Sequence, residues 1–463
     1  MNEINNEEVK YSTKIHVSFG MASFLDGIFV AAFSVRIIDF YENELLLGII
    51  WVGVAFGIFG LWNMVNDPLL GYLSDLNNRI TRKYGRRFPV YLFGALTFGA
   101  VYFLVFVVPF RDQFGMFIWL VTTICVYELL FSLWQIGWLS LFPDKFRSNK
   151  ERTKVGAWCT IWGVIGMVMG VSIPPMFIEY GNVSTYILAA AVLMVIGLLM
   201  TLLTIPGMRE DEEIIERNLR LEGKSKEKDS FWTTLKYSLK DKNFLAYIIT
   251  YLCHQTLTVM MLASLPYWVK YVIGSDDPGV ETMLSLGFLV GVIAAIPLWA
   301  YIGRKMGNRK GFIIGAFTTT ILIIPLLIVS DAIGSTIAIT LVGVGVAAIW
   351  VLMFPCFSDV IDDIVVRTEK RQEGVYTGIR TFFGRISFIV QAVAFAIVHP
   401  LTGYQAGAPI GGQTPLAIFG IRILMAIVPM MFYFIGFIMM WKVYDLEKSC
   451  VAENKEILLK RLL

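Results

Sequence analysis

Apolar residues along this chain gather into long runs that are separated by short polar or charged stretches. Many of these runs reach about 20 residues, the length that an α-helix needs to cross the hydrocarbon core of a bilayer. The pattern predicts an all-α membrane protein with twelve transmembrane helices. The expected spans cover residues 15–40, 47–74, 88–110, 114–141, 155–179, 184–206, 244–272, 281–303, 311–330, 334–363, 374–399 and 416–443.

One polar stretch is far longer than the others and lies between the sixth and seventh spans. It contains the charged segments 209–213 and 224–228, so we expect a solvated cytoplasmic linker there. Basic segments at 82–87 and 304–310 occupy similar positions in the two halves on either side of it. Two six-helix halves are typical of one large class of secondary transporters. The predicted parts are an N-terminal six-helix bundle (1–206), the linker (207–242), a C-terminal six-helix bundle (243–445) and a cytoplasmic tail (446–463).

Composition narrows the class of protein further. Hydrophobic residues make up 56% of the chain and charged residues only 16%, whereas soluble domains hold about 25% charged residues. The sequence has no Walker motif, no nucleophile elbow, and no Cys or His spacing typical of a zinc site. We therefore expect a protein that is not an enzyme, with no cofactor, no nucleic-acid partner and no metal beyond a transported Na⁺.

The placement of charges predicts the orientation in the membrane. Lys and Arg collect in the loops after the second, fourth, eighth and tenth spans, while the opposite loops are acidic or neutral. Because basic loops stay on the cytoplasmic side, this predicts a multi-pass protein of the cell membrane with both termini in the cytoplasm. The acidic residues assigned to the opposite loops are Glu42, Glu44, Asp276, Asp277 and Asp331.

A few carboxylates and amides lie inside the apolar spans, where a charge costs roughly 2.5–3.5 kcal/mol or more. Asp26 lies in the first span, and Asp67 lies in the second, one helical turn after Asn63. Glu128 in the fourth span shares a helix face with Gln135. Oxygen ligands of this kind suit a hard cation, and a single carboxylate of the set could instead carry a proton. The alternative is ion pairing between helices, for which the basic partners would be Arg36 and Arg385.

Four short motifs resemble those of a known family. The first half holds Asn-Asp-Pro at 66–68 and Tyr-Gly-Arg-Arg-Phe-Pro at 84–89, and the second half holds Ser-Asp-Val-Ile-Asp-Asp at 358–363 and Thr-Glu-Lys-Arg-Gln-Glu-Gly at 368–374. Together they resemble the major facilitator superfamily and, within it, the glycoside–pentoside–hexuronide:cation symporters, which include the melibiose carriers. The resemblance covers nearly the whole chain. It implies two six-helix bundles that transport their substrate by alternating access.

The resemblance also implies roles for individual residues. Asn63 and Gln135 stand where the family pattern has Asp, and Thr160 stands where it has Arg. These differences favour a different or less polar substrate than melibiose. The expected substrate-binding residues are Asp26, Gln135, Thr160, Trp350 and Arg385. The expected cation-binding residues are Asn63, Asp67 and Glu128, and the expected cytoplasmic gate consists of Arg152, Asp359 and Asp362.

The function that we expect is cation-coupled symport of a sugar or glycoside, with Na⁺ or H⁺ as the coupling ion. The alternative is a transporter of a lysolipid or another amphiphile on the same fold, which the loss of sugar-contacting polar groups favours. A non-transporting membrane sensor would need a signalling domain or a long interaction tail, and residues 446–463 offer neither. The expected partners are a small-molecule substrate, a coupling cation and the lipid bilayer.

Overall fold

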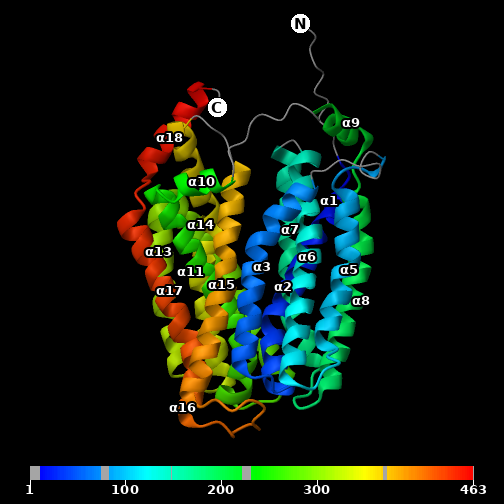
Figure 1. Ribbon diagram of the computed structural model, residues 1–463. Helices are drawn as coiled ribbons and strands as arrows, with labels where there is room; N and C mark the ends of the chain where they lie inside the picture. Colours follow the sequence, from blue (N-terminus) through cyan, green and yellow to red (C-terminus); the bar gives the residue numbers. More distant parts are fainter. Residues whose placement is uncertain (1–10, 75–82, 147–148, 222–230, 369–372, 462–463) are drawn as a thin grey trace. The chain divides into compact units, whose positions relative to one another are not determined.

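The computed structural model describes residues 11–74, 83–146, 149–221, 231–368 and 373–461. Every regular element in these ranges is a helix, as Figure 1 shows. Twelve helical segments of the described chain are long and apolar enough to cross a membrane. The predicted all-α fold with twelve spans is therefore confirmed.

The helices begin and end within a few residues of most predicted spans. Before the 207–242 linker the helices are α1 Thr13–Gly20, α2 Ala22–Asp39, α3 Ile49–Ser74, α5 Phe88–Phe106, α6 Gln113–Lys145, α7 Asn149–Ser172 and α8 Val183–Met208. The segment predicted as the linker contains α9 Glu212–Leu221 and α10 Phe231–Ser238. The later helices are α11 Lys242–Tyr267, α12 Pro278–Met306, α13 Asn308–Leu322, α14 Ala332–Thr368, α15 Glu373–Thr402, α16 Pro415–Arg422, α17 Val428–Ile438 and α18 Lys448–Arg461.

Short π-helices and 3-10 helices extend several of these α-helices. A π-helix, η1 (Phe40–Glu44), continues α2, and another, η3 (Trp268–Ile273), continues α11. Two further π-helical segments are η5 Ile423–Ile427 and η6 Met439–Val443, and two 3-10 segments are η2 Pro174–Met176 and η4 Ile324–Leu327. Because π-helical turns are rare and often occur at functional sites, the C-terminal ends of α2 and α11 are candidate functional positions.

Contacts divide the chain into two compact units. The first comprises Met1–Phe40 and Trp62–Lys226, and the second comprises Tyr41–Leu61 and Glu227–Leu463. The segment Tyr41–Leu61, which covers most of η1 and the first half of α3, therefore groups with the second unit, although it precedes the predicted linker in sequence. The predicted division of the chain at residues 207–242 stays a prediction.

Aspartates begin several helices of both units. The side chain of Asp112 accepts a hydrogen bond from the backbone N–H of Gly115 at the start of α6, at 2.7 Å. Asp241 does the same for α11 and Asp277 for α12. Such side chains satisfy backbone donors that have no partner within the helix, and they fix where the helix begins.

Glycines let the helices of the first unit approach closely. A Cβ atom at Gly166 of α7 would lie 2.3 Å from the carbonyl oxygen of Phe24 on α2, and one at Gly170 would lie 2.3 Å from that of Ile28. Small residues at such positions let the backbones of two transmembrane helices pack closely. In the second unit, Gly343 of α14 approaches the backbone of α12 at Phe288 in the same way.

Candidate functional site

Two of the expected substrate-binding residues meet inside the first unit. The amide nitrogen of Gln135 on α6 donates a hydrogen bond to Asp26 Oδ1 on α2 at 2.8 Å. Both side chains are half-buried. The bond pairs a carboxylate with an amide at membrane depth, where polar side chains mark substrate or ion pathways.

Buried oxygen-bearing side chains continue from this pair along α6 and onto α3. Glu128 is 3% exposed, and Ser132 donates to its Oε1 at 3.4 Å. Asn63 on α3 is fully buried. The indole N–H of Trp62 donates to the carbonyl of Cys125 at 3.0 Å, so the segment of α3 that carries Asn63 lies beside the segment of α6 that carries Glu128.

The third expected cation ligand, Asp67, has a side chain outside the described residues, so the set of three stays a prediction. Its neighbour Asn66 was not among the expected ligands, yet it is fully buried. Neither amide atom of Asn66 has a hydrogen-bond partner among the residues that the structure describes. A buried amide without partners is unfavourable, which singles out this turn of α3. The sequence signal was its place in the Asn-Asp-Pro motif.

The other three expected substrate-binding residues lie on α7, α14 and α15. The hydroxyl of Thr160 on α7 is exposed and donates to the carbonyl of Gly156 in its own helix at 3.0 Å. Trp350 on α14 belongs to the second unit, where it meets Phe288 edge-on at 6.2 Å between ring centres. Arg385 on α15 is half-buried in the same unit.

The expected gate residues are distributed over both units. Arg152 of the first unit donates through Nε to the carbonyl of Phe146 at 2.7 Å, beyond the C-terminal end of α6. In the second unit, Asp359 is buried and accepts a hydrogen bond from Asn308 at 2.7 Å, and Asp362 is half-buried. An ion pair from Arg152 to either aspartate stays a prediction.

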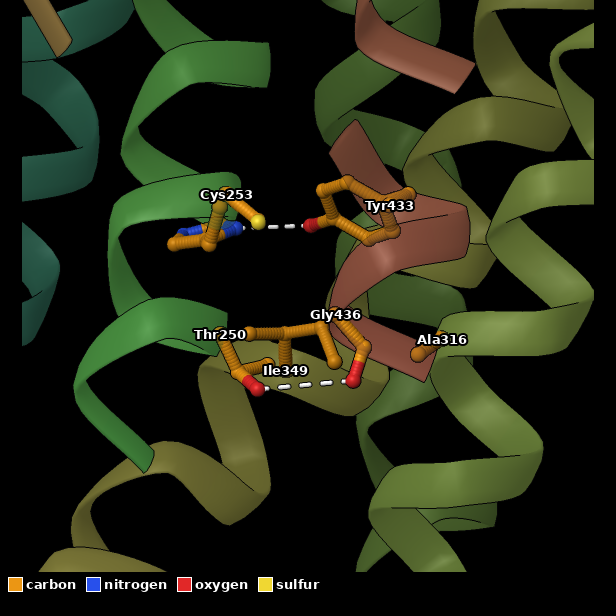
Figure 2. A pocket seen from close by; sticks show the side chains of 7 residues that line it. Thr250, Cys253, Ala316, Ile349, Tyr433 and Gly436 are labelled. Atoms are coloured by element: carbon orange, nitrogen blue, oxygen red, sulfur yellow. Dashed lines mark hydrogen bonds between the residues drawn. The ribbon is translucent and has the colours of Figure 1, made fainter. Parts of the chain in front are cut away.

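A small cavity in the second unit lies beside His254. Figure 2 shows it between α11, α13, α14 and α17, with the Thr250 hydroxyl directed at the Gly436 carbonyl. His254 Nδ1 lies 2.7 Å from the Tyr433 hydroxyl. The volume of about 10 Å³ is near the lower limit for one water molecule. It is too small for a sugar, so we regard it as a void between packed helices.

A polar network around Glu42 was missed by the sequence reasoning, which assigned this residue to an acidic loop. Glu42 lies in η1 and is 2% exposed. The hydroxyl of Tyr267 donates to one of its oxygens at 2.6 Å, and His399 Nδ1 lies 2.7 Å from the other. The only sequence signal was that residues 40–44 contain no Gly or Pro that would end the helix. All three residues belong to the second unit.

Comparison with known proteins identifies similar transporters. Residues 18–448 match a protein family described as MFS/sugar transport protein. The chain is 21% identical over 439 residues to the sodium-dependent lysophosphatidylcholine symporter 1 of Gallus gallus, covering 86% of this chain and 80% of that protein. It is 23% identical over 453 residues to the glucuronide carrier protein homolog of Escherichia coli strain K12, covering 94% and 93%.

Solved structures agree on the fold. The nucleoside transporter NupG superposes with a TM-score of 0.60 at 13% sequence identity, over 92% of this chain and 99% of that one. At that identity the likeness concerns the arrangement of helices alone.

Proposed function

Because the chain belongs to the family of MFS/sugar transport proteins, we propose that it is a symporter that couples transport of a sugar or glycoside to Na⁺ or H⁺. It works by alternating access in the cell membrane, with both termini in the cytoplasm. The twelve apolar helices and the family support membrane transport. The Escherichia coli relative is a glucuronide carrier homolog by name, which supports a sugar derivative as substrate.

The hydrogen bond between Asp26 and Gln135 is the observation on which the substrate proposal depends. A carboxylate accepts hydrogen bonds and an amide both donates and accepts them. Held 2.8 Å apart on two helices, they present the few convergent polar groups that a sugar with many hydroxyls needs within an apolar site. Thr160, Trp350 and Arg385 complete the proposed substrate-binding set.

The proposed cation site uses Asn63, Asp67 and Glu128. The burial of Asn63 and Glu128 and the bond that ties α3 to α6 support it. Their oxygen atoms suit a hard cation such as Na⁺. The proposed cytoplasmic gate consists of Arg152, Asp359 and Asp362, whose ion pairs would break as the transporter alternates between states.

A lysolipid is the second candidate substrate. The match to a sodium-dependent lysophosphatidylcholine symporter over 86% of the chain supports it, and the presence of Thr160 where sugar carriers of the family have Arg fits a less polar ligand. In either case, the Asp26–Gln135 pair would bind the polar part of the substrate.

Uptake into proteoliposomes tests the proposal. We expect uptake of a glycoside that depends on a gradient of Na⁺ or H⁺. Asp26→Asn keeps the size of the side chain but removes its charge, so we expect at least a tenfold loss of substrate affinity, which corresponds to about 1.4 kcal/mol. Asp276→Asn, at an exposed position before α12, is the control and should leave uptake unchanged.

Two outcomes would contradict the proposal. Undiminished affinity in Asp26→Asn would remove this carboxylate from the substrate site. Uptake of lysolipid but of no sugar or glycoside would replace the first candidate by the second.

A further inference from the structure

The guanidinium group of Arg380 on α15 lies among three aromatic rings of the second unit. Its Cζ atom is 4.5 Å from the ring centre of Tyr251 on α11. The corresponding distances are 4.7 Å to Phe354 and 5.3 Å to Phe357, both on α14. Cation–π attraction acts within about 6 Å of a ring centre, so three rings from two helices hold this one cation.

Neighbouring residues make room for two of these rings or stack on them. One turn further along α15, a Cβ atom at Gly384 would lie 2.7 Å from the Tyr251 ring, so a glycine gives that ring its space. Tyr247 stacks on Phe357 at 5.1 Å and 24° between ring planes. The Tyr247 hydroxyl is buried and has no hydrogen-bond partner within the described ranges. A polar donor without a partner thus belongs to the same aromatic cluster.

Among the residues that the structure describes, no acceptor or carboxylate bonds to Arg380. A guanidinium carries five N–H donors, and α15 is one of the segments apolar enough to cross a membrane. Arg422 shows the usual arrangement: it lies 5.2 Å from the Trp268 ring, but it also donates to Leu326, Val329 and Ser330. Arg380 has the rings without the acceptors.

We propose that Arg380 and its three rings bind the anionic group of the transported molecule. This inference rests on the proposed function and adds the class of substrate: one with an oxyanion beside its sugar or acyl part. A guanidinium binds a carboxylate or a phosphate through two parallel hydrogen bonds. The oxyanion could be the carboxylate of a uronic acid or the phosphodiester of a lysolipid, and both use the same contacts.

Matched pairs of ligands test the inference on the full-length protein in lipid nanodiscs. The first pair is 4-nitrophenyl β-D-glucuronide and 4-nitrophenyl β-D-glucoside, which differ in the carboxylate. The second pair is palmitoyl lysophosphatidylcholine and 1-palmitoylglycerol, which differ in the headgroup. We expect the wild type to bind the oxyanion-bearing member of one pair at least tenfold more tightly, and that pair identifies the source of the oxyanion.

Substitutions assign the preference to Arg380. Arg380→Gln should abolish it by weakening only the binding of the oxyanion-bearing ligand, and Arg380→Lys should retain part of it, because an ammonium keeps the charge but not the paired geometry. Phe354→Ala removes a ring that is 63% exposed; we expect it to fold and to weaken anion binding severalfold. Arg422→Gln is the matched control and should lower the Tm without changing the preference.

The inference fails if the wild type shows no preference in either pair, or if Arg380→Gln and Phe354→Ala keep the full preference. Equal binding of ligands with and without the oxyanion would leave the proposed function standing. If none of the four ligands binds, the proposed substrate classes are wrong and the inference falls with them.

Discussion

Glu151 is a carboxylate whose chemistry is set by its immediate neighbours. His16 Nε2 lies 2.5 Å from its Oε2, and Lys154 donates to its Oε1 at 3.2 Å. Burial acts to raise the pKa of Glu151, but these hydrogen bonds and one from the backbone of Tyr11 outweigh it and lower the pKa below its ordinary value of 4.5. The folded protein therefore favours the charged carboxylate.

The stability that Glu151 contributes should depend on pH. A carboxylate whose pKa falls on folding stabilises the protein above its unfolded-state pKa, and this contribution is lost as pH falls through the folded-state pKa. We expect Glu151→Gln to lower the Tm of purified protein at neutral pH and the difference from wild type to shrink below about pH 4.5. Glu213→Gln, at an exposed position of α9, is the control. A difference that persists unchanged to the lowest pH would count against this role.

At the scale of helices, the contact between α2 and α7 depends on glycine. Adding a methyl group at Gly166 brings it 2.3 Å from a backbone oxygen of α2, so the helices must separate. We expect Gly166→Ala to destabilise the protein by about 1–3 kcal/mol, the usual effect of overpacking. The readout is thermal unfolding in detergent.

The same helix offers a control of opposite sign. A Cβ atom at Gly156 of α7 would have nothing within 4 Å of it other than its own helix and chain neighbours. Because alanine is favoured over glycine in a helix by about 0.5–1 kcal/mol, Gly156→Ala should stabilise the protein. Equal effects at both positions would mean that helix propensity rather than the contact with α2 decides stability.

At the scale of the whole molecule, the network around Glu42 connects residues that are more than 200 positions apart in sequence. Tyr267 and His399 hold its carboxylate, and the His399 ring stacks on Tyr404 at 4.1 Å between ring centres. The hydroxyl of Tyr404 in turn donates to Asn43 at 2.8 Å. These contacts join the segment Tyr41–Leu61 to the rest of the second unit.

Removal of one hydrogen-bond donor should show how much this network contributes to thermal stability. Hydrogen bonds to charged groups contribute about 1.5–3 kcal/mol and neutral ones about 1 kcal/mol. We expect Tyr267→Phe, which removes a bond to Glu42, to lower the Tm more than Tyr271→Phe, which removes a bond to the Ala408 carbonyl. In the Glu42→Gln background the two Tyr substitutions should have similar effects. A larger loss from Tyr271→Phe in the wild type would contradict a charged network.

The sequence predicted the elements of this fold better than the contacts between them. Apolar runs of membrane length identify twelve helices, because this signal is local. Asp26 and Gln135 were expected in one site from a family resemblance, and the structure joins them. Glu42 was assigned to a loop because its partners lie far along the chain. An ion pair between Arg152 and Asp359, which are also far apart in sequence, stays a prediction.

The membership of residues 41–61 in the second unit bears on how this protein could be made in pieces. If the gene were split at the linker, the second polypeptide would lack the segment that supplies Glu42 to Tyr267 and His399. The first polypeptide would carry that segment away from the groups that bury its carboxylate. The second product would lack part of its compact unit, so we expect that co-expression of both fragments is needed to restore the protein. We therefore expect the two halves of the chain to complement each other as fragments and not to behave as interchangeable modules.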